Sequence, residues 1–227
     1  ALAPVWVAFR WAERSLGVRG AFIAAGTCAL WYELVYFAPK ALTEVVSGNV
    51  LVVGVFLADR IARATEARRR DVLACAGLLA LSAMMRIQLA PAAGICFLFM
   101  FVKLSARLRW EAVAVASAVV LAVGMIDAIT WSYPFSSFVD NIRVNIVEGK
   151  SKHYGVAPWY AYFQAYAELW GLAGLGVIAL AIVGATRAKL AGITALVVVV
   201  THVPIAHKEY RFLYPALVLV IMLAGMG

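Results

Sequence analysis

Charge is scarce in this sequence: only 14% of its 227 residues are charged, whereas 65% are hydrophobic. Soluble globular proteins have about 25% charged and about 45–50% apolar residues. A soluble fold of this size could not remove so much apolar surface from water. The composition therefore excludes a soluble globular protein and predicts an integral membrane protein.

Catalytic motifs of soluble enzymes are also missing. The sequence contains no Walker loop, no nucleophile elbow and no HExxH zinc motif, so ATP-driven transport has no support within this chain. Cysteine is scarce as well: Cys28, Cys75 and Cys96 lie apart in apolar segments, without the spacing of metal ligands. We expect all three to be small, buried hydrophobic side chains.

What is present is a series of apolar stretches separated by polar segments. Lipid requires backbone groups to bond internally, and about 20 apolar residues cross a membrane as a helix. The sequence predicts an all-α, multi-span transmembrane helix bundle, forming one multi-pass membrane domain over residues 1–227. The expected spans are a partial one at 1–9 and others near 20–37, 42–58, 72–85, 87–102, 112–131, 160–185, 190–206 and 212–227.

The chain begins at Ala1, inside an apolar stretch without a basic leader. This pattern is not that of a signal peptide. We therefore expect part of the protein to lie upstream.

Basic residues are unevenly distributed among the linking segments. Thirteen of the 20 Lys and Arg residues lie in four short segments, at 10–19, 59–71, 103–111 and 187–189. Because an excess of Lys and Arg marks the cytoplasmic side, we expect these segments inside. The net charge of +8 is thus interpreted as a topology signal that also suits an anionic leaflet, and nucleic acid is not a predicted partner.

The topology depends on segment 72–102. If this segment were a single span, every later loop would change sides and the inside would hold the same number of basic residues. A helix of about 30 residues would, however, be about 45 Å long, which exceeds the hydrocarbon core. It would also place Arg86 near mid-membrane, and Pro91 would interrupt it. We therefore predict a hairpin with Arg86 at its tip.

This hairpin gathers the remaining polar segments on the external face, luminal or periplasmic. They are Lys40, Arg86, the loop 132–159 and the segment 207–211. The chain shows no obvious soluble domain, so the external loop is a candidate for the functional site.

The segment "HKEYRFLYP" (207–215) places four ionisable side chains between two apolar stretches. On a helix, His207 and Arg211 would share a face and could jointly bind a phosphate. Lys208 would add charge, and Glu209 could orient a cation or accept a sugar hydroxyl. The alternative is an ordinary interfacial cap with snorkelling basic side chains.

Other polar residues allow two interpretations each. Arg86, in "MMRIQLAPA", needs an anion or a carboxylate. Asp127, in "MIDAITW", could pair with Arg86, bind a metal or bond a sugar, and a structural role is favoured. The aromatic residues of "YGVAPWYAYF" (154–163) favour an interfacial belt, although with His153 they also suit a sugar phosphate. In "FAPKALTEVVSGN", Glu44 is interpreted as a polar residue at a helix start.

Together these segments resemble glycosyltransferase family 22, the α-mannosyltransferases that extend N-glycan precursors and GPI anchors, with their bacterial relatives. "HKEYRFLYP" is similar to the family's HKExRF signature, and "YGVAPWYAYF" to its YGxxPWxxYF segment. "NIRVNIVEGKSKHYG" resembles the Asn-containing run before that segment, and Asp127 and Arg86 fall at similar places. "FAPKALTEVVSGN" is also similar, with Lys40 where members usually carry Arg.

The resemblance implies a GT-C-type fold with its site on the external face. It implies inverting transfer of a sugar, mannose in the working hypothesis, from a polyprenyl (dolichyl-type) phosphate donor to a lipid-linked glycan acceptor. The predicted substrate-binding residues are His207, Lys208, Glu209, Arg211, Arg86, Asp127, His153, Tyr154 and Trp159. The family's acidic catalytic motif has no match in this chain, so we expect it upstream of Ala1 and assign no catalytic residue. No cofactor is predicted, and a divalent metal stays an open alternative.

Two other functions fit the same residues: a carrier or flippase of a lipid-linked sugar, and a non-catalytic scaffold subunit. The predicted spans are nearly free of charge apart from Glu33 and Glu168, which favours an enzyme with its polar groups on one face. The predicted location is a bacterial inner membrane, which the Ala-, Val- and Arg-rich composition favours, or the endoplasmic reticulum membrane in a eukaryote.

Overall fold

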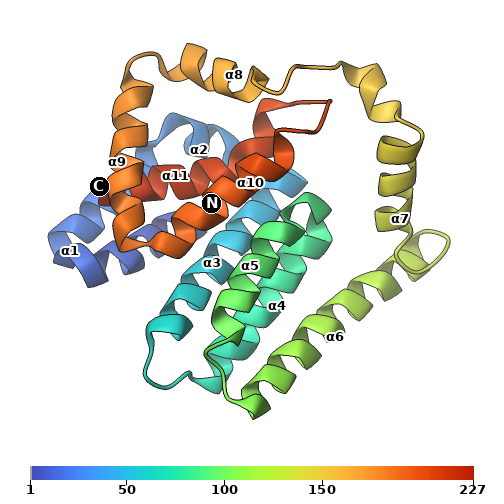
Figure 1. The fold of residues 1–227 in the computed structure, drawn as a ribbon, viewed down its shortest axis with the longest axis horizontal. Coiled ribbons are helices and arrows are strands. Elements are labelled where there is room, and N and C mark those ends of the chain that lie inside the picture. Colours follow the sequence, from blue (N-terminus) through green and yellow to red (C-terminus); the bar gives the residue numbers. More distant parts are fainter. Residues whose placement is uncertain (1) are drawn as a thin grey trace.

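The computed structural model describes residues 2–227, and its regular elements in this range are all helical (Figure 1). The predicted all-α fold is confirmed. The α-helices are α1 (Leu2–Leu30), α2 (Tyr32–Phe37), α3 (Thr43–Arg63), α4 (Arg69–Met85), α5 (Ala90–Phe101), α6 (Ala106–Thr130), α7 (Ser136–Ile142), α8 (Ala161–Trp170), α9 (Ala173–Arg187), α10 (Lys189–His202) and α11 (Tyr214–Met226). Short turns of other helix types are η1 (Ile87–Leu89), η2 (Arg143–Val147), η3 (Lys150–Tyr154) and η4 (Tyr210–Leu213).

Two of the described helices, α3 and α6, are long and apolar enough to cross a membrane alone. The pair α8 and α9 adds a third if it is counted as one bent span. The apolar segments Ile87–Phe101, Lys189–His202 and Tyr210–Met226 are helical but shorter. The apolar stretches of the sequence therefore form helices, although many are shorter than the predicted spans.

The expected span at 160–185 is not one straight helix. Its two parts, α8 and α9, meet at an angle of 110°. Gly171 lies between them with φ of 54°, a left-handed conformation that side chains other than glycine rarely adopt. α8 consequently runs across one end of the bundle, and α9 turns away from it along the bundle (Figure 1).

α1 is also bent, at Gly17 (φ 71°, ψ −173°). The rings of Phe9 and Phe22 lie 5.3 Å apart across this bend. Thirteen residues of straight helix would separate them by roughly 20 Å, so the two halves of α1 fold back on each other. The basic segment 10–19 forms the tip of this bend, between two apolar stretches as predicted.

The predicted hairpin at 72–102 is present. α4 ends at Met85, and Arg86 has an extended backbone (φ −151°, ψ 102°). η1 and α5 follow, and α5 packs beside α4 and α3 (Figure 1). At the other end of the hairpin, the Arg109 guanidinium donates to the carbonyls of Phe101 and Val102 and so caps α5.

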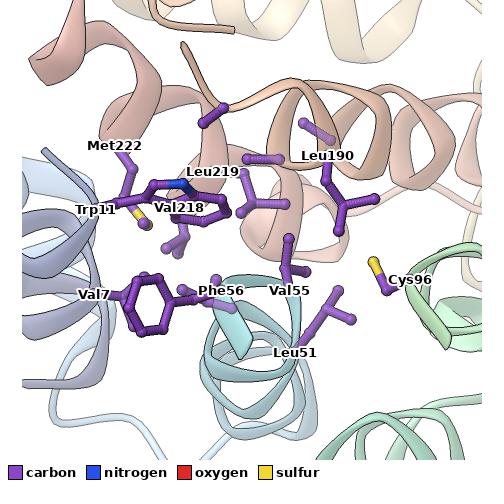
Figure 2. Packing of buried hydrophobic residues seen from close by; sticks show 14 of the residues in the cluster. Val7, Trp11, Leu51, Val55, Phe56, Cys96, Leu190, Val218, Leu219 and Met222 are labelled. Carbon is purple, nitrogen blue, oxygen red and sulfur yellow. The ribbon is translucent and has the colours of Figure 1, made fainter. Parts of the chain in front are cut away.

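The core is centred on α11, nearly all of whose side chains are buried. Figure 2 shows Val218, Leu219 and Met222 of this helix packed among side chains of α1, α3, α5 and α10. α9 approaches so closely that a Cβ at Gly184 would collide with the carbonyl oxygen of Leu223. Small residues of this kind let helices pack tightly in membranes.

The three cysteines are buried and free, as expected. The thiol of Cys96 lies 3.1 Å from the Thr194 hydroxyl, and that of Cys75 donates to the Gly54 carbonyl. They act as small packing residues that satisfy local polar groups.

The four basic segments come together at one end of the bundle, here called the basic end. Arg63 donates to the carbonyl of Arg187 (3.0 Å), Arg69 pairs with Glu111 (2.6 Å), and Trp11 donates to Asp59. α3 alone carries the chain from this end to Glu44, over roughly 29 Å. That distance matches the hydrocarbon core of a bilayer.

Candidate functional site

The candidate site lies at the end of the bundle opposite the basic end. It forms where the start of α3, the turn at Arg86, the segment 203–213 and the loop 150–160 meet. This end of α10 and η4 lies beneath the connection from α7 to α8 (Figure 1). The predicted gathering of Arg86 with the 207–211 segment is therefore observed.

The helical arrangement considered for His207 and Arg211 is not present. α10 ends at His202, and Pro204 has no amide hydrogen with which to continue the helical hydrogen-bond pattern. The chain is extended at Glu209 (φ −123°, ψ 141°), and η4 begins only at Tyr210. His207 and Arg211 therefore do not meet through helical spacing.

They meet instead through Glu209. The Nε2 atom of His207 lies 3.1 Å from one carboxylate oxygen of Glu209, and the Nε atom of Arg211 lies 2.8 Å from the other. Partial burial raises the pKa of Glu209, but the hydrogen bonds from His207 and Arg211 outweigh it, so the pKa lies below its ordinary value. Glu209 thus stays charged and orients both side chains.

A second carboxylate, Glu44, holds Arg86. The Arg86 Nη1 atom lies 2.6 Å from the Glu44 Oε1 atom, and both side chains are almost fully buried. Arg211 lies 3.9 Å from the same oxygen. The Phe212 ring contacts both guanidinium groups, with centroid distances of 4.7 Å to Arg86 and 5.8 Å to Arg211. The sequence required either a bound anion or a carboxylate as the partner of Arg86, and the structure supplies the carboxylate of Glu44.

Lys208 adds a third cation. Its ammonium group donates to the carbonyl of Ile205 and lies 5.6 Å from the centre of the Tyr162 ring. Burial lowers the pKa of Lys208. The described cluster therefore has three cations against the two carboxylates Glu44 and Glu209, with His207 as a further donor. Arg86 also has a buried Nε atom without a hydrogen-bond partner among residues 2–227.

The loop before α8 packs against the cluster. The Nδ1 atom of His207 lies 3.2 Å from the carbonyl oxygen of Gly155, and the Ala157 amide donates to the Ala206 carbonyl. The Tyr154 ring lies 6.0 Å from the His207 ring. Both ring nitrogens of His207 thus face oxygen acceptors. Tyr154 is the aromatic residue of the predicted set that reaches the cluster.

Two other predicted residues of this loop point elsewhere. The His153 ring lies 3.2 Å from the Lys150 carbonyl and is exposed. Trp159 is exposed and contacts the rings of Tyr160 and Phe163. The geometry of Trp159 fits the aromatic-belt interpretation.

Asp127 has a local partner instead of Arg86, so the suggested Asp127–Arg86 pair is wrong. Its Oδ2 atom accepts hydrogen bonds from the amide and the hydroxyl of Ser137, at 3.1 and 2.5 Å. A carboxylate in this position satisfies free amides at the start of α7. Across residues 2–227, no group of three or more His, Cys, Asp or Glu side chains is placed to hold a metal ion.

Sequence reasoning missed three residues that shape the site. Glu44 was treated as a helix-start residue, because nothing local indicates a partner 42 positions away. Tyr162 was grouped with the exposed aromatic residues, yet it is buried. Its spacing to Tyr166 and Trp170, at i+4 and i+8, was the available signal. His202 is fully buried with its Nε2 atom unpartnered, and no pattern pointed to it.

An apolar cavity of about 340 Å³ adjoins the cluster. Tyr162 belongs to both, since its ring lies under Lys208 and also lines the cavity. The other lining residues come from α8 to α11 and are almost all apolar, among them Tyr166, Trp170, Leu175, Ile178, Val199, Leu217 and Val220. Surplus positive charge thus lies directly beside an apolar cavity.

Comparison with known proteins agrees with these features. The sequence pattern of the Alg9-like mannosyltransferase family matches residues 6–227. The chain belongs to this family. It is 30% identical over 121 residues to GPI mannosyltransferase 3 of Yarrowia lipolytica, a match that covers 52% of this chain and 23% of that protein. No solved structure matches the chain.

Proposed function

We propose that the protein is a membrane α-mannosyltransferase that moves mannose from a polyprenyl-phosphate donor to a lipid-linked glycan. The observation that carries the proposal is the cationic cluster beside the apolar cavity. Such a donor has its phosphate between a sugar and a hydrocarbon chain, so its binding needs cations next to an apolar surface. Arg211, His207 and Lys208 are the phosphate-binding residues in this proposal.

The chemistry follows from this placement. An acceptor hydroxyl attacks the anomeric carbon as the lipid phosphate leaves, which inverts the configuration at that carbon. Negative charge grows on the leaving phosphate, and Arg211 and Lys208 stabilise it. Arg86 supports Arg211 through their shared contact with Glu44. A carboxylate must accept the hydroxyl proton, and we assign that role to none of the residues in this cluster.

The external face is proposed as the side of reaction. The support is the separation of the two ends, since the basic segments, which mark the cytoplasmic side, lie a full helix length from Arg86 and Arg211. The name of the yeast relative suggests a GPI-type glycolipid as one acceptor to test.

The test is mannose transfer from radiolabelled polyprenyl-phosphate mannose in membranes that contain the full-length protein. We expect Arg211→Ala and His207→Ala, at matched expression, to lose at least about tenfold in transfer, as is typical when a charged transition-state contact is removed. Arg143→Ala is the matched control, because Arg143 forms an exposed pair with Glu148 in the external loop.

Unchanged transfer in both site variants would refute the phosphate-binding role of the cluster. If the wild type itself transfers no mannose, the carrier function becomes the working hypothesis. Flipping of a lipid-linked sugar in reconstituted vesicles would then be measured with the same variants.

A further inference from the structure

A second arrangement of charged and apolar residues lies at the basic end, where α1 packs on α3. Phe56, Asp59, Arg60 and Arg63 have the spacing i, i+3, i+4 and i+7, so they share one face of α3. Trp11 of α1 packs on this face, with its ring 5.6 Å from the Phe56 ring and its Nε1 atom bonded to Asp59.

Arg14 lies one turn further along α1. Its guanidinium group lies 4.8 Å from the centre of the Phe56 ring, a cation–π contact, and Arg60 lies one turn from Phe56 on α3. Arg10, Arg60 and Arg63 are all near enough to repel its charge. Asp59 attracts it, but Asp59 already binds Arg63 at 2.9 Å.

The neighbouring guanidinium groups each have a carboxylate partner. Arg10 pairs with Glu13 and Arg60 with Asp71. Arg14 has no carboxylate within ion-pair distance in the described chain. It is therefore a surplus positive charge, held in position by an aromatic ring and surrounded by like charges. An anion at this point would relieve the repulsion.

Exposed apolar side chains lie before and after Arg14 on α1. Trp6, whose ring also packs on the Phe56 ring, is half exposed, and Val18 and Phe22 are more exposed still. Along α1, Trp6 comes before Arg14, whereas Val18 and Phe22 follow it beyond the bend at Gly17. In a membrane protein such side chains face lipid, so Arg14 lies at the border between the charged end and the lipid-facing surface.

We propose that Arg14 and Arg60 bind the phosphate of an anionic phospholipid whose acyl chains lie on the apolar surface of α1. The shared chemistry is phosphate recognition by two neighbouring guanidinium groups. The exposed Trp6, Val18 and Phe22 favour a phospholipid over free phosphate. Basic pockets between helices on the cytoplasmic side are suited to anionic head groups. This inference does not rest on the proposed mannosyl transfer.

The experiment uses the full-length protein purified in a mild detergent. Native mass spectrometry counts the molecules retained after addition of phosphatidylglycerol, phosphatidylcholine or inorganic phosphate. We expect the wild type to retain phosphatidylglycerol about fivefold more strongly than phosphatidylcholine, since one basic residue near the surface contributes about that factor. Arg14→Gln should remove this preference.

Arg19→Gln is the matched control, because Arg19 lies on the same bend but makes no ring contact or ion pair in the described structure. Its preference for phosphatidylglycerol should equal that of the wild type. Equal preference in Arg14→Gln and the wild type would overturn the proposal, and so would equal retention of the two lipids. Arg14-dependent binding of inorganic phosphate without any lipid preference would overturn the assignment to a phospholipid.

Size-exclusion chromatography shows whether Arg14→Gln is folded. If it is not, the phospholipids that co-purify with the wild type decide the question. Enrichment of anionic phospholipid above its proportion in the source membrane supports the proposal, and no enrichment overturns it.

Discussion

The two ends of the bundle both contain pairs of Arg and carboxylate, but the pairs differ in exposure. At the site end, the side chains of Glu44 and Arg86 are 6% and 9% exposed. At the basic end, Arg69 and Arg107 are 64% and 84% exposed in their contacts with Glu111. Buried pairs are strongly coupled, because removal of one partner leaves an uncompensated charge, whereas exposed pairs contribute little. The Glu44–Arg86 pair should therefore be more strongly coupled than the pairs around Glu111.

Glu44→Ala should give the largest effect and tests this comparison directly. Without the carboxylate, Arg86 is a buried charge with no ionic partner, and we expect the protein to lose about 3–5 kcal/mol of unfolding free energy. Glu13→Ala, which breaks the exposed Arg10–Glu13 pair, should cost less than about 1 kcal/mol. Thermal and denaturant unfolding in detergent measure both, and similar losses in the two variants would contradict the contrast between the ends.

The second prediction concerns the close packing of α9 on α11, between the two ends of the chain's core. Gly184→Ala places a methyl group against the Leu223 backbone, so α9 and α11 must separate. Overpacking of this kind costs about 1–3 kcal/mol. Gly176→Ala is the control on the same helix, since nothing lies within 4 Å of a Cβ there. Equal melting temperatures of the two variants would show that the α9–α11 contact is not close.

The third prediction compares carboxylates at the two ends of the bundle, and its first measurement is the pH dependence of unfolding. Because the folded pKa of Glu209 lies below its ordinary value of 4.5, its contribution to stability is complete above that value. The contribution is lost as pH falls through the lowered folded pKa. Glu209→Gln should remove this acid dependence from unfolding curves measured between pH 3 and 6, and it should lower mannose transfer at neutral pH. Glu111→Gln at the basic end should leave transfer at the wild-type rate.

The smallest effect is expected for Tyr162→Phe. The Tyr162 hydroxyl is buried without a hydrogen-bond partner in the described residues, so its removal should change stability by less than about 1 kcal/mol. If that hydroxyl contacts the donor, the KM for polyprenyl-phosphate mannose should rise several-fold while unfolding is unchanged. A stability loss as large as that of Glu44→Ala would show that the hydroxyl has a structural partner.

The sequence was sufficient for the class of fold and for the two-ended arrangement. Apolar stretches and the clustering of basic residues are properties of local composition, so they predicted the helices and the basic end. The hairpin at 72–102, with Arg86 at its tip, was predicted from the length that a single helix would have and from the cost of burying a charge in the membrane. These arguments need no knowledge of which helices touch.

The details of the site could not be predicted in the same way. The Glu44–Arg86 pair joins residues that are distant in sequence, and only the packing of α3 on α4 brings them together. At 207–211, the shared face of His207 and Arg211 depended on a helix, whereas the chain is extended at Glu209. The bend at Gly171 was missed because glycine is also common in straight membrane helices.

The Phe212 ring has a consequence for the charge of the candidate site. Its centre lies 4.7 Å from the guanidinium group of Arg86 and 5.8 Å from that of Arg211. A benzene ring attracts cations through the negative potential of its faces, yet it carries no net charge. Phe212 therefore holds both arginines without adding negative charge to that of Glu44 and Glu209, so the cluster with Lys208 keeps a surplus positive charge for an incoming anion.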